Sequence, residues 1–154
     1  MPLDLSHYMM ELFELKETDP GTYSPLVLAY IGDSVFDLIV KSMVINKGNR
    51  QVQKLHGETS QLVQASTQSL MMRAIQEHLT ETEHGIYGRG RNAKTVTPAK
   101  NQSITDYRRA TGFEALIGYL YLKREYQRLM ALVKMGLEYL EDEETGNVKL
   151  NKGD

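Results

Sequence analysis

The sequence predicts an all-α fold, and three observations lead to this prediction. Apolar residues recur at helical spacing through most of the 154 residues, and no segment alternates apolar and polar residues over the roughly four to eight positions of a half-buried strand. Proline, glycine and capping residues divide this pattern into separate helices. The hydrophobic fraction of 41% and the charged fraction of 25% are ordinary for a globular protein, and the length suits one domain.

Turn and capping residues mark out the first three helices. An apolar stripe predicts a short helix over residues 8–16, which the turn at residues 19–21 ends. Ser24-Pro25 offers an N-cap residue followed by proline at the first helical position, so a long helix is expected over residues 26–45. A third helix is expected over residues 51–64.

A fourth helix is expected after Ser66, and a capping box predicts a short fifth helix. The box consists of Thr80 and, three positions later, Glu83. The segment that follows, residues 88–103, is polar, contains glycine and is interrupted by Pro98. We therefore predict a surface loop there.

Two long helices complete the prediction. With Ser103 or Thr105 as the N-cap, an apolar stripe continues to Tyr121, and a last helix is expected over residues 125–140. The acidic residues that follow predict a solvated tail. We expect three regions, namely an N-terminal extension with a short helix over 1–22, the main helical domain over 23–142 and a flexible C-terminal tail over 143–154.

Composition narrows the kinds of site and of protein. Because the chain has no cysteine, a metal would be held by oxygen or imidazole ligands. No apolar run approaches the roughly 20 residues that span a bilayer, and no cleavable signal is recognised, so we expect a soluble, cytoplasmic protein. The net charge of −2 gives no overall attraction to nucleic acid. Residues 87–100 nevertheless contain no acid and four basic residues: Arg89, Arg91, Lys94 and Lys100.

An aspartate interrupts the apolar helix expected over residues 26–45. Asp33 follows Gly32, and glycine inside a helix costs about 1 kcal/mol relative to alanine. Asp37 lies one turn later on the same face, together with Tyr30, and two such carboxylates repel unless a cation or base lies nearby. The alternative is that Lys41 pairs with Asp37 and the strip is the solvated side of an amphipathic helix.

A second unusual carboxylate, Glu114, lies among apolar residues in the helix that begins near residue 103. Gly112 and Gly118 would let that helix approach another one closely and bring Glu114 near Asp33. Paired carboxylates there would hold Mg²⁺ well. The alternative is a surface ion pair between Glu114 and a nearby basic residue, Arg108 or Lys123.

The segments around these carboxylates resemble the two carboxylate motifs of the ribonuclease III family. Residues 28–34, Leu-Ala-Tyr-Ile-Gly-Asp-Ser, are similar to its signature segment, and residues 113–118, Phe-Glu-Ala-Leu-Ile-Gly, to its second carboxylate helix. Residues 89–94, 98–101 and 107–108 are similar to the shorter mini-ribonuclease III branch. The resemblance covers about residues 23–140, so no double-stranded-RNA-binding domain is expected.

This resemblance implies an all-helical, homodimeric endoribonuclease that binds double-stranded RNA across the dimer. Asp33 and Glu114 would be the catalytic residues and the ligands of Mg²⁺, for which Mn²⁺ can substitute. Hydrolysis would leave 5′-phosphate and 3′-hydroxyl ends. The substrate implied for this branch is precursor ribosomal RNA (23S), and a ribosomal protein is a further candidate partner.

The chain departs from the full-length enzymes at three positions where they carry further carboxylates. It has Leu26, Ala29 and Thr111 there. Waters and RNA phosphate oxygens would have to complete the octahedron that Mg²⁺ requires, so we expect weak metal affinity without RNA. Glu58, in the third helix, is a further candidate ligand.

The basic segment is expected to contact RNA. Arginine and lysine can follow phosphates without reading bases, and Asn92 can reach a 2′-hydroxyl or a base edge in the minor groove of A-form RNA. The expected RNA-binding residues are Arg89, Arg91, Asn92, Lys94 and Lys100. Supporting roles are expected for Tyr30, Asp37 and Arg108. The alternative is a loop that only aids solubility.

Two rival functions follow from the same residues. A non-catalytic RNA-binding or ribosome-assembly module would keep the fold without cutting RNA. A helical adaptor would use the apolar surface over residues 113–121 to bind a protein partner.

Overall fold

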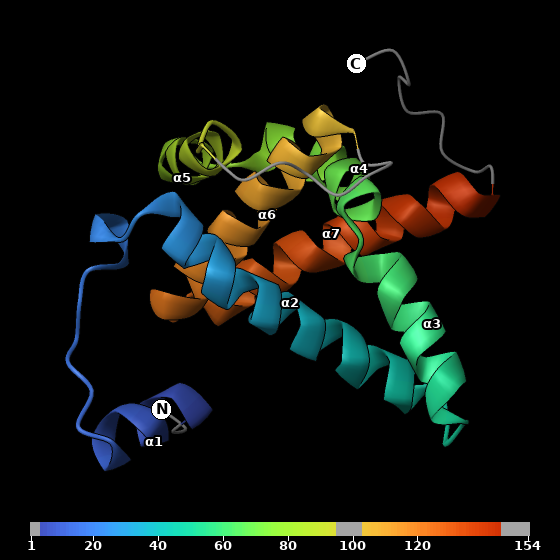
Figure 1. Cartoon of the computed structure of the whole chain (residues 1–154), viewed down its shortest axis with the longest axis horizontal. Coiled ribbons are helices and arrows are strands. Elements are labelled where there is room, and N and C mark those ends of the chain that lie inside the picture. Colours follow the sequence, from blue (N-terminus) through green and yellow to red (C-terminus); the bar gives the residue numbers. More distant parts are fainter. Residues whose placement is uncertain (1–3, 95–102, 146–154) are drawn as a thin grey trace.

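The computed structural model describes residues 4–94 and 103–145, and all regular structure in these ranges is helical (Figure 1). The α-helices are α1 (Leu5–Leu12), α2 (Pro25–Asn46), α3 (Val52–Val63), α4 (Ala65–Ile75), α5 (Glu81–Arg91), α6 (Ile104–Leu122) and α7 (Tyr126–Thr145). Short 3-10 turns occur at Pro20–Thr22 and Gln76–His78. The all-α prediction is confirmed. Within the described ranges, no helix combines the length and hydrophobicity needed to cross a membrane.

Helix α6 lies at the centre of the fold, with α2, α4, α5 and α7 packed against it (Figure 1). From Ala110 to Leu120, a fully described segment, every residue is buried except Glu114. Phe113 packs edge to face against Phe36 of α2, with 5.1 Å between the ring centroids. A helix that is apolar on all sides is a core helix. The adaptor hypothesis is therefore wrong, because the surface it assigned to a partner is occupied by the domain itself.

Side-chain caps set where three of the helices begin. The Ser24 hydroxyl accepts the backbone N–H of Val27 at 3.3 Å, at the start of α2. Thr80 and Glu83 form the predicted reciprocal capping box of α5. Ser103, one of the two predicted candidates, caps α6. These predictions are confirmed because capping depends on residues that are neighbours in the sequence.

Glycines allow α2 and α6 to cross with their backbones in contact. A Cβ atom at Gly32 would overlap the carbonyl oxygen of Glu114, and one at Gly118 would overlap the carbonyl oxygen of Leu28. No side chain larger than hydrogen fits at either position. The predicted role of Gly118 in a close helix crossing is therefore confirmed.

Gly112 takes part in a different crossing, between α5 and α6. A Cβ atom at Gly112 would lie 2.7 Å from the ring of Tyr87, and one at Gly90 would lie 2.9 Å from Gly112 Cα. This packing keeps α5 helical through Arg91, so the predicted surface loop over residues 88–103 is wrong at its start. Helix α6 already begins at Ile104. Residues 95–102 of the predicted loop lie outside the described residues.

The first helix is shifted relative to its prediction and lies at the periphery of the molecule (Figure 1). Asp4 caps α1 by accepting the backbone N–H of His7 at 2.8 Å, and Glu14, with a φ of 51°, turns the chain away after Leu12. No residue of α1, which the structure describes in full, is buried. The apolar side predicted for residues 8–16 therefore does not join the core.

The last helix is longer than predicted and is tied to α5. Helix α7 continues to Thr145, past the expected end at residue 140, because glutamate is a good helix former even in a charged run. The expected tail over 143–154 thus begins inside this helix. Glu83 in α5 is buried and binds the guanidinium of Arg128 in α7 at 2.8 and 2.9 Å. This ion pair lowers the pKa of Glu83.

Candidate active site

The crossing of α2 and α6 places the two candidate carboxylates side by side. Asp33 follows the glycine that contacts the Glu114 backbone, and its carboxylate lies close enough to act on the Glu114 carboxyl group. Asp33 is exposed, whereas Glu114 is half-buried. The pair therefore forms a surface site that is open on the Asp33 side, as a large substrate requires.

Burial and a like charge act together on Glu114. Loss of solvation raises its pKa most, followed by the hydrogen bond to Asp33 and the negative charge of Asp33, which together bring the pKa to about 8. Glu114 is consequently protonated at neutral pH when no cation is present. A divalent cation between the two groups would favour the doubly ionised pair instead.

A third side chain, Gln68 of α4, reaches the same carboxyl group. It is only 1% exposed and acts on Glu114 in the opposite direction, lowering its pKa. Gln68 was not among the residues predicted for the site. A signal was present in the sequence, because Gln68 is a polar residue at helical spacing from the buried Met71, Met72 and Ile75.

The other polar residues of the α2 strip do not join this pair. Asp37 forms an ion pair with Lys41, with 2.9 Å between carboxylate oxygen and Nζ, as the alternative interpretation held. Tyr30 is 80% exposed. On α6, the Thr111 hydroxyl donates to the carbonyl of Tyr107 at 2.9 Å, so it takes no carboxylate-like role.

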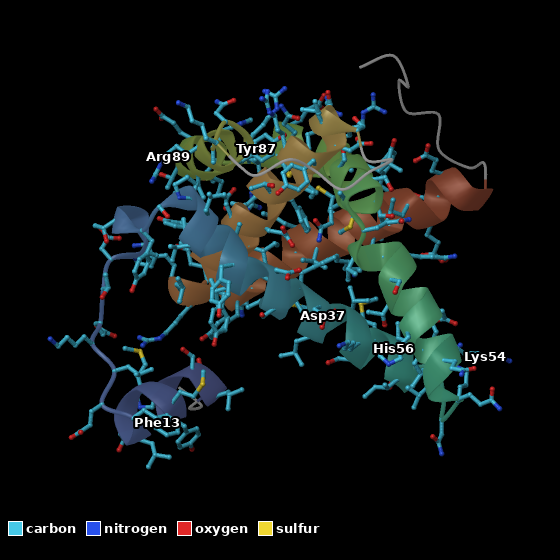
Figure 2. All side chains as sticks on the ribbon, viewed as in Figure 1. Phe13, Asp37, Lys54, His56, Tyr87 and Arg89 are labelled. Atoms are coloured by element: carbon cyan, nitrogen blue, oxygen red, sulfur yellow. The ribbon has the colours of Figure 1, made fainter. Side chains whose placement is uncertain are left out.

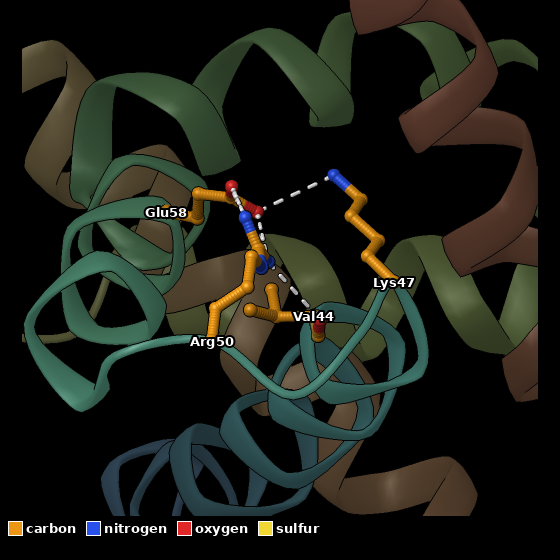
Figure 3. Close-up of polar contacts among 4 residues, drawn as sticks. All are labelled: Val44, Lys47, Arg50 and Glu58. Carbon is orange, nitrogen blue, oxygen red and sulfur yellow. Dashed lines mark hydrogen bonds and ion pairs between the residues drawn. The ribbon is translucent and has the colours of Figure 1, made fainter.

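Glu58 is held at the connection between α2 and α3 (Figure 3). Its carboxylate accepts hydrogen bonds from Arg50 and, at 3.4 Å, from Lys47, while Arg50 also donates to the Val44 carbonyl at 3.2 Å. These contacts, chiefly with Arg50, lower the pKa of Glu58 to about 2. They give Glu58 a structural partner in place of a metal. Among the described residues, no group of three or more acidic or histidine side chains could hold a metal ion.

The described members of the predicted RNA-binding set lie at the C-terminal end of α5 and just beyond it. Figure 2 shows Arg89 on this helix. The Arg89 guanidinium donates to the Tyr23 carbonyl at 3.2 Å, which connects this end to the start of α2. Asn92 is the C-cap residue, and Lys94 is exposed. Lys100 lies outside the described residues. The helix C-terminus favours nearby cations, so two arginines in the last turn also stabilise α5.

A second part of this basic surface comes from α6. Arg91 and Arg109 both act electrostatically on the buried Tyr87, whose pKa burial raises and these cations lower in part. Arg109 was not predicted from the sequence, because only the packing of α6 on α5 brings it near Arg91. The predicted Arg108 is exposed on the same turn of α6. Arg91 and Arg109 therefore join α5 and α6 into one basic surface.

Comparison with known proteins agrees with this arrangement. The family model of the ribonuclease III domain matches residues 26–125. A mini-ribonuclease 3 of Clostridium tetani is 46% identical over 130 residues, covering 84% of this chain and 86% of the relative. One of Brevibacillus brevis is 40% identical over 125 residues, covering 81% and 93%.

A solved structure has the same fold. The crystal structure of a Fusobacterium nucleatum protein superposes with a TM-score of 0.72 at 26% identity, covering 79% of this chain and 98% of that one. The match of the family model extends across both carboxylates and the helix crossing between them. The chain therefore belongs to the ribonuclease III family, in its mini-ribonuclease III branch, and is an endoribonuclease.

Proposed function

We propose that the chain cleaves double-stranded RNA in a metal-dependent reaction at Asp33 and Glu114. The observation that carries this proposal is the closeness of the two carboxyl groups at the α2–α6 crossing. A phosphodiester hydrolase must stabilise charge on the scissile phosphate, which two carboxylates cannot do without a cation. Membership of the ribonuclease III family supports the same assignment.

The donor set fits a hard divalent cation. Both ligands are carboxylates, which Mg²⁺ and Mn²⁺ prefer, and they lie where an added positive charge relieves their mutual repulsion. When bound, Mg²⁺ supplies Lewis-acid stabilisation of the phosphate and lowers the pKa of a bound water. Asp33 faces solvent and can meet the substrate, while the half-buried Glu114 is held by its neighbours. The expected products carry 5′-phosphate and 3′-hydroxyl ends.

The basic surface of α5 and α6 is assigned to the RNA backbone. Gly90 contacts Gly112, two residues before Glu114, so the end of α5 lies within about one helical turn of the carboxylate pair along α6. Arginines in this position can hold phosphates beside the site without reading bases. Precursor 23S ribosomal RNA is the substrate proposed from the resemblance, in the cytoplasm and with a ribosomal protein as a further candidate partner.

A homodimer is proposed from the exposed face of α2. A groove there is lined by Val35, Leu38 and Ile39 of α2, by Leu129 and Met130 of α7 and by Leu5 of α1. Leu38 and Met130 are exposed, as are Leu26, Val27 and Tyr30 nearer the start of α2. A soluble domain rarely leaves such a patch uncovered. A second copy would bury it and bring two active sites to one RNA duplex.

Cleavage of precursor ribosomal RNA with Mg²⁺, with mapping of the new ends, tests this function. Asp33→Asn and Glu114→Gln should each abolish cleavage while the protein stays folded by circular dichroism. Glu138→Gln removes the same charge from an exposed pair with Lys134 and should cleave like the unmodified protein.

Binding without cleavage would favour the non-catalytic RNA-binding module. Normal cleavage by Asp33→Asn would instead show that the site is wrongly assigned. If the protein cleaves other double-stranded RNA but not the ribosomal precursor, only the proposed substrate is wrong.

A further inference from the structure

Gln68 is a buried polar side chain that the packing of α4 does not require. It lies on the same face as Met71, Met72 and Ile75, all completely buried. Within the described part of the chain, its amide nitrogen Nε2 has no hydrogen-bond partner in good geometry. Leaving such a group unsatisfied costs about 1–3 kcal/mol, so a role outside packing is expected.

Gln68 lies close to the Glu114 carboxyl group. Helix α4 packs directly on α6, and Gln68 interacts with Glu114 across this contact. Among the groups that act on Glu114, Gln68 alone favours its ionised form, as a nearby N–H donor does. Asp33 approaches the same carboxyl group from α2, so Glu114 lies between a donor and a second carboxylate.

We propose that Gln68 is a positioning residue whose Nε2 donates to one carboxylate oxygen of Glu114 and thereby directs the other oxygen toward the cation. The proposal rests on the proposed function, in which Glu114 is a metal ligand. A partner of this kind selects one orientation of a ligand that would otherwise rotate.

The competing explanation is that Gln68 only fills space. Glutamine and methionine have similar size and shape, so Gln68→Met removes the donor and keeps the volume. If the side chain only fills space, this variant should behave normally in every assay. If the amide positions Glu114, metal binding should suffer although the fold does not.

The test measures metal binding apart from activity. Gln68→Met should keep or raise Tm without metal, because an unsatisfied buried amide is removed. Its affinity for Mn²⁺, from electron paramagnetic resonance of the free ion, should fall about 10- to 100-fold. The rise in Tm caused by millimolar Mn²⁺ should shrink accordingly. Cleavage should lose kcat with little change in KM for RNA. Gln76→Met, at an exposed glutamine that follows α4, is the matched control and should change none of these.

Unchanged Mn²⁺ affinity and cleavage in Gln68→Met would overturn the proposal. A lower Tm with normal Mn²⁺ affinity of the folded protein would also overturn it, in favour of packing. Asp33→Asn and Glu114→Gln distinguish a failure of the Gln68 proposal from a failure of the proposed metal site. If both lose Mn²⁺ binding and Gln68→Met does not, only the positioning role fails. If neither loses it, the metal site and the positioning role fail together.

Discussion

Glu114, one of the two proposed metal ligands, lowers the stability of the metal-free fold at neutral pH. It is half-buried beside Asp33, and its pKa of about 8 lies well above the ordinary 4.5. Between these two values the folded protein holds a proton that the unfolded chain has released. Stability therefore falls as the pH rises from about 4.5 to about 8, and the penalty is absent below this window.

Asp33→Asn should accordingly stabilise the metal-free protein. The change removes the negative charge beside Glu114, which lowers the Glu114 pKa and relieves part of the penalty. We expect a gain on the order of 1 kcal/mol at pH 8, which corresponds to less than about one pKa unit, and almost no gain at pH 4. Urea unfolding with a chelator at both pH values measures it. A variant that is less stable than the unmodified protein at pH 8 would contradict the electrostatic account.

At the scale of elements, the α2–α6 crossing is the feature that builds the site. Gly32 and Gly118 bring the backbones into contact. Asp33 follows Gly32, and Glu114 lies opposite Gly32, so the two carboxyl groups come close together. Glycine disfavours helix, so the intrinsic cost at these positions is offset by packing. The same arrangement recurs at Gly90 and Gly112, where α5 joins α6.

Gly32→Ala should strongly destabilise the fold. Its methyl group would overlap a rigid backbone carbonyl, so the helices must separate, at a cost of about 3 kcal/mol or more. Chemical denaturation measures this loss, and cleavage should fall as well because the carboxylates move apart.

Gly85→Ala provides the matched control for this prediction. Gly85 lies in helix α5 with open space around it, so alanine should raise stability by about 0.5–1 kcal/mol. If Gly32→Ala and Gly85→Ala change stability equally, the α2–α6 crossing has room for a methyl group at Gly32 and the prediction is wrong.

At the scale of the whole molecule, the local distribution of charge matters more for RNA binding than the net charge. The chain carries a net charge of −2, yet Arg91 and Arg109 lie together where α5 and α6 meet. Phosphate contacts release counterions, so RNA affinity should fall steeply with salt. The local surface, and not the overall charge, decides this dependence.

Arg91→Ala and Arg109→Ala should each weaken RNA binding and reduce the slope of log affinity against log salt by about 1. The measurement is made with Asp33→Asn as background, so that RNA is bound without being cut. Lys134→Ala, which removes a cation from the exposed pair on α7, should leave affinity and slope nearly unchanged. An unaltered slope in both arginine variants would remove this surface from the proposed RNA interface.

Dimer formation can be tested on the exposed face of α2. Leu38 is 61% exposed and lines the apolar groove shared with α7. Leu38→Glu would bury an unpaired charge in a dimer and should shift the mass from twice to once 17.5 kDa in light scattering. Val52→Glu places the same charge on an equally exposed residue of α3 and should leave the dimer intact. A dimer that survives Leu38→Glu would place the interface elsewhere.

The sequence alone determined the helices and most of their starting points. Helical periodicity and capping are local properties, so the positions of α2, α5 and α6 follow from Ser24, Thr80 and Ser103 and their neighbours. The motifs around Asp33 and Glu114 also identified the family by their resemblance to its signature segments. Both carboxylates were noticeable because each interrupts an apolar helix.

Only the tertiary structure decided which side chains act together. Helix α5 continues through the glycine-containing segment because Gly90 packs on Gly112, a contact that local propensity cannot reveal. Asp37 was expected to support the site and Glu58 was a further candidate ligand, but Asp37 pairs with Lys41, and Glu58 pairs with Arg50 and Lys47. Gln68 became a candidate for the site because α4 packs on α6. The physical reason is common to these cases, because solvation and partners depend on contacts between residues far apart in the chain.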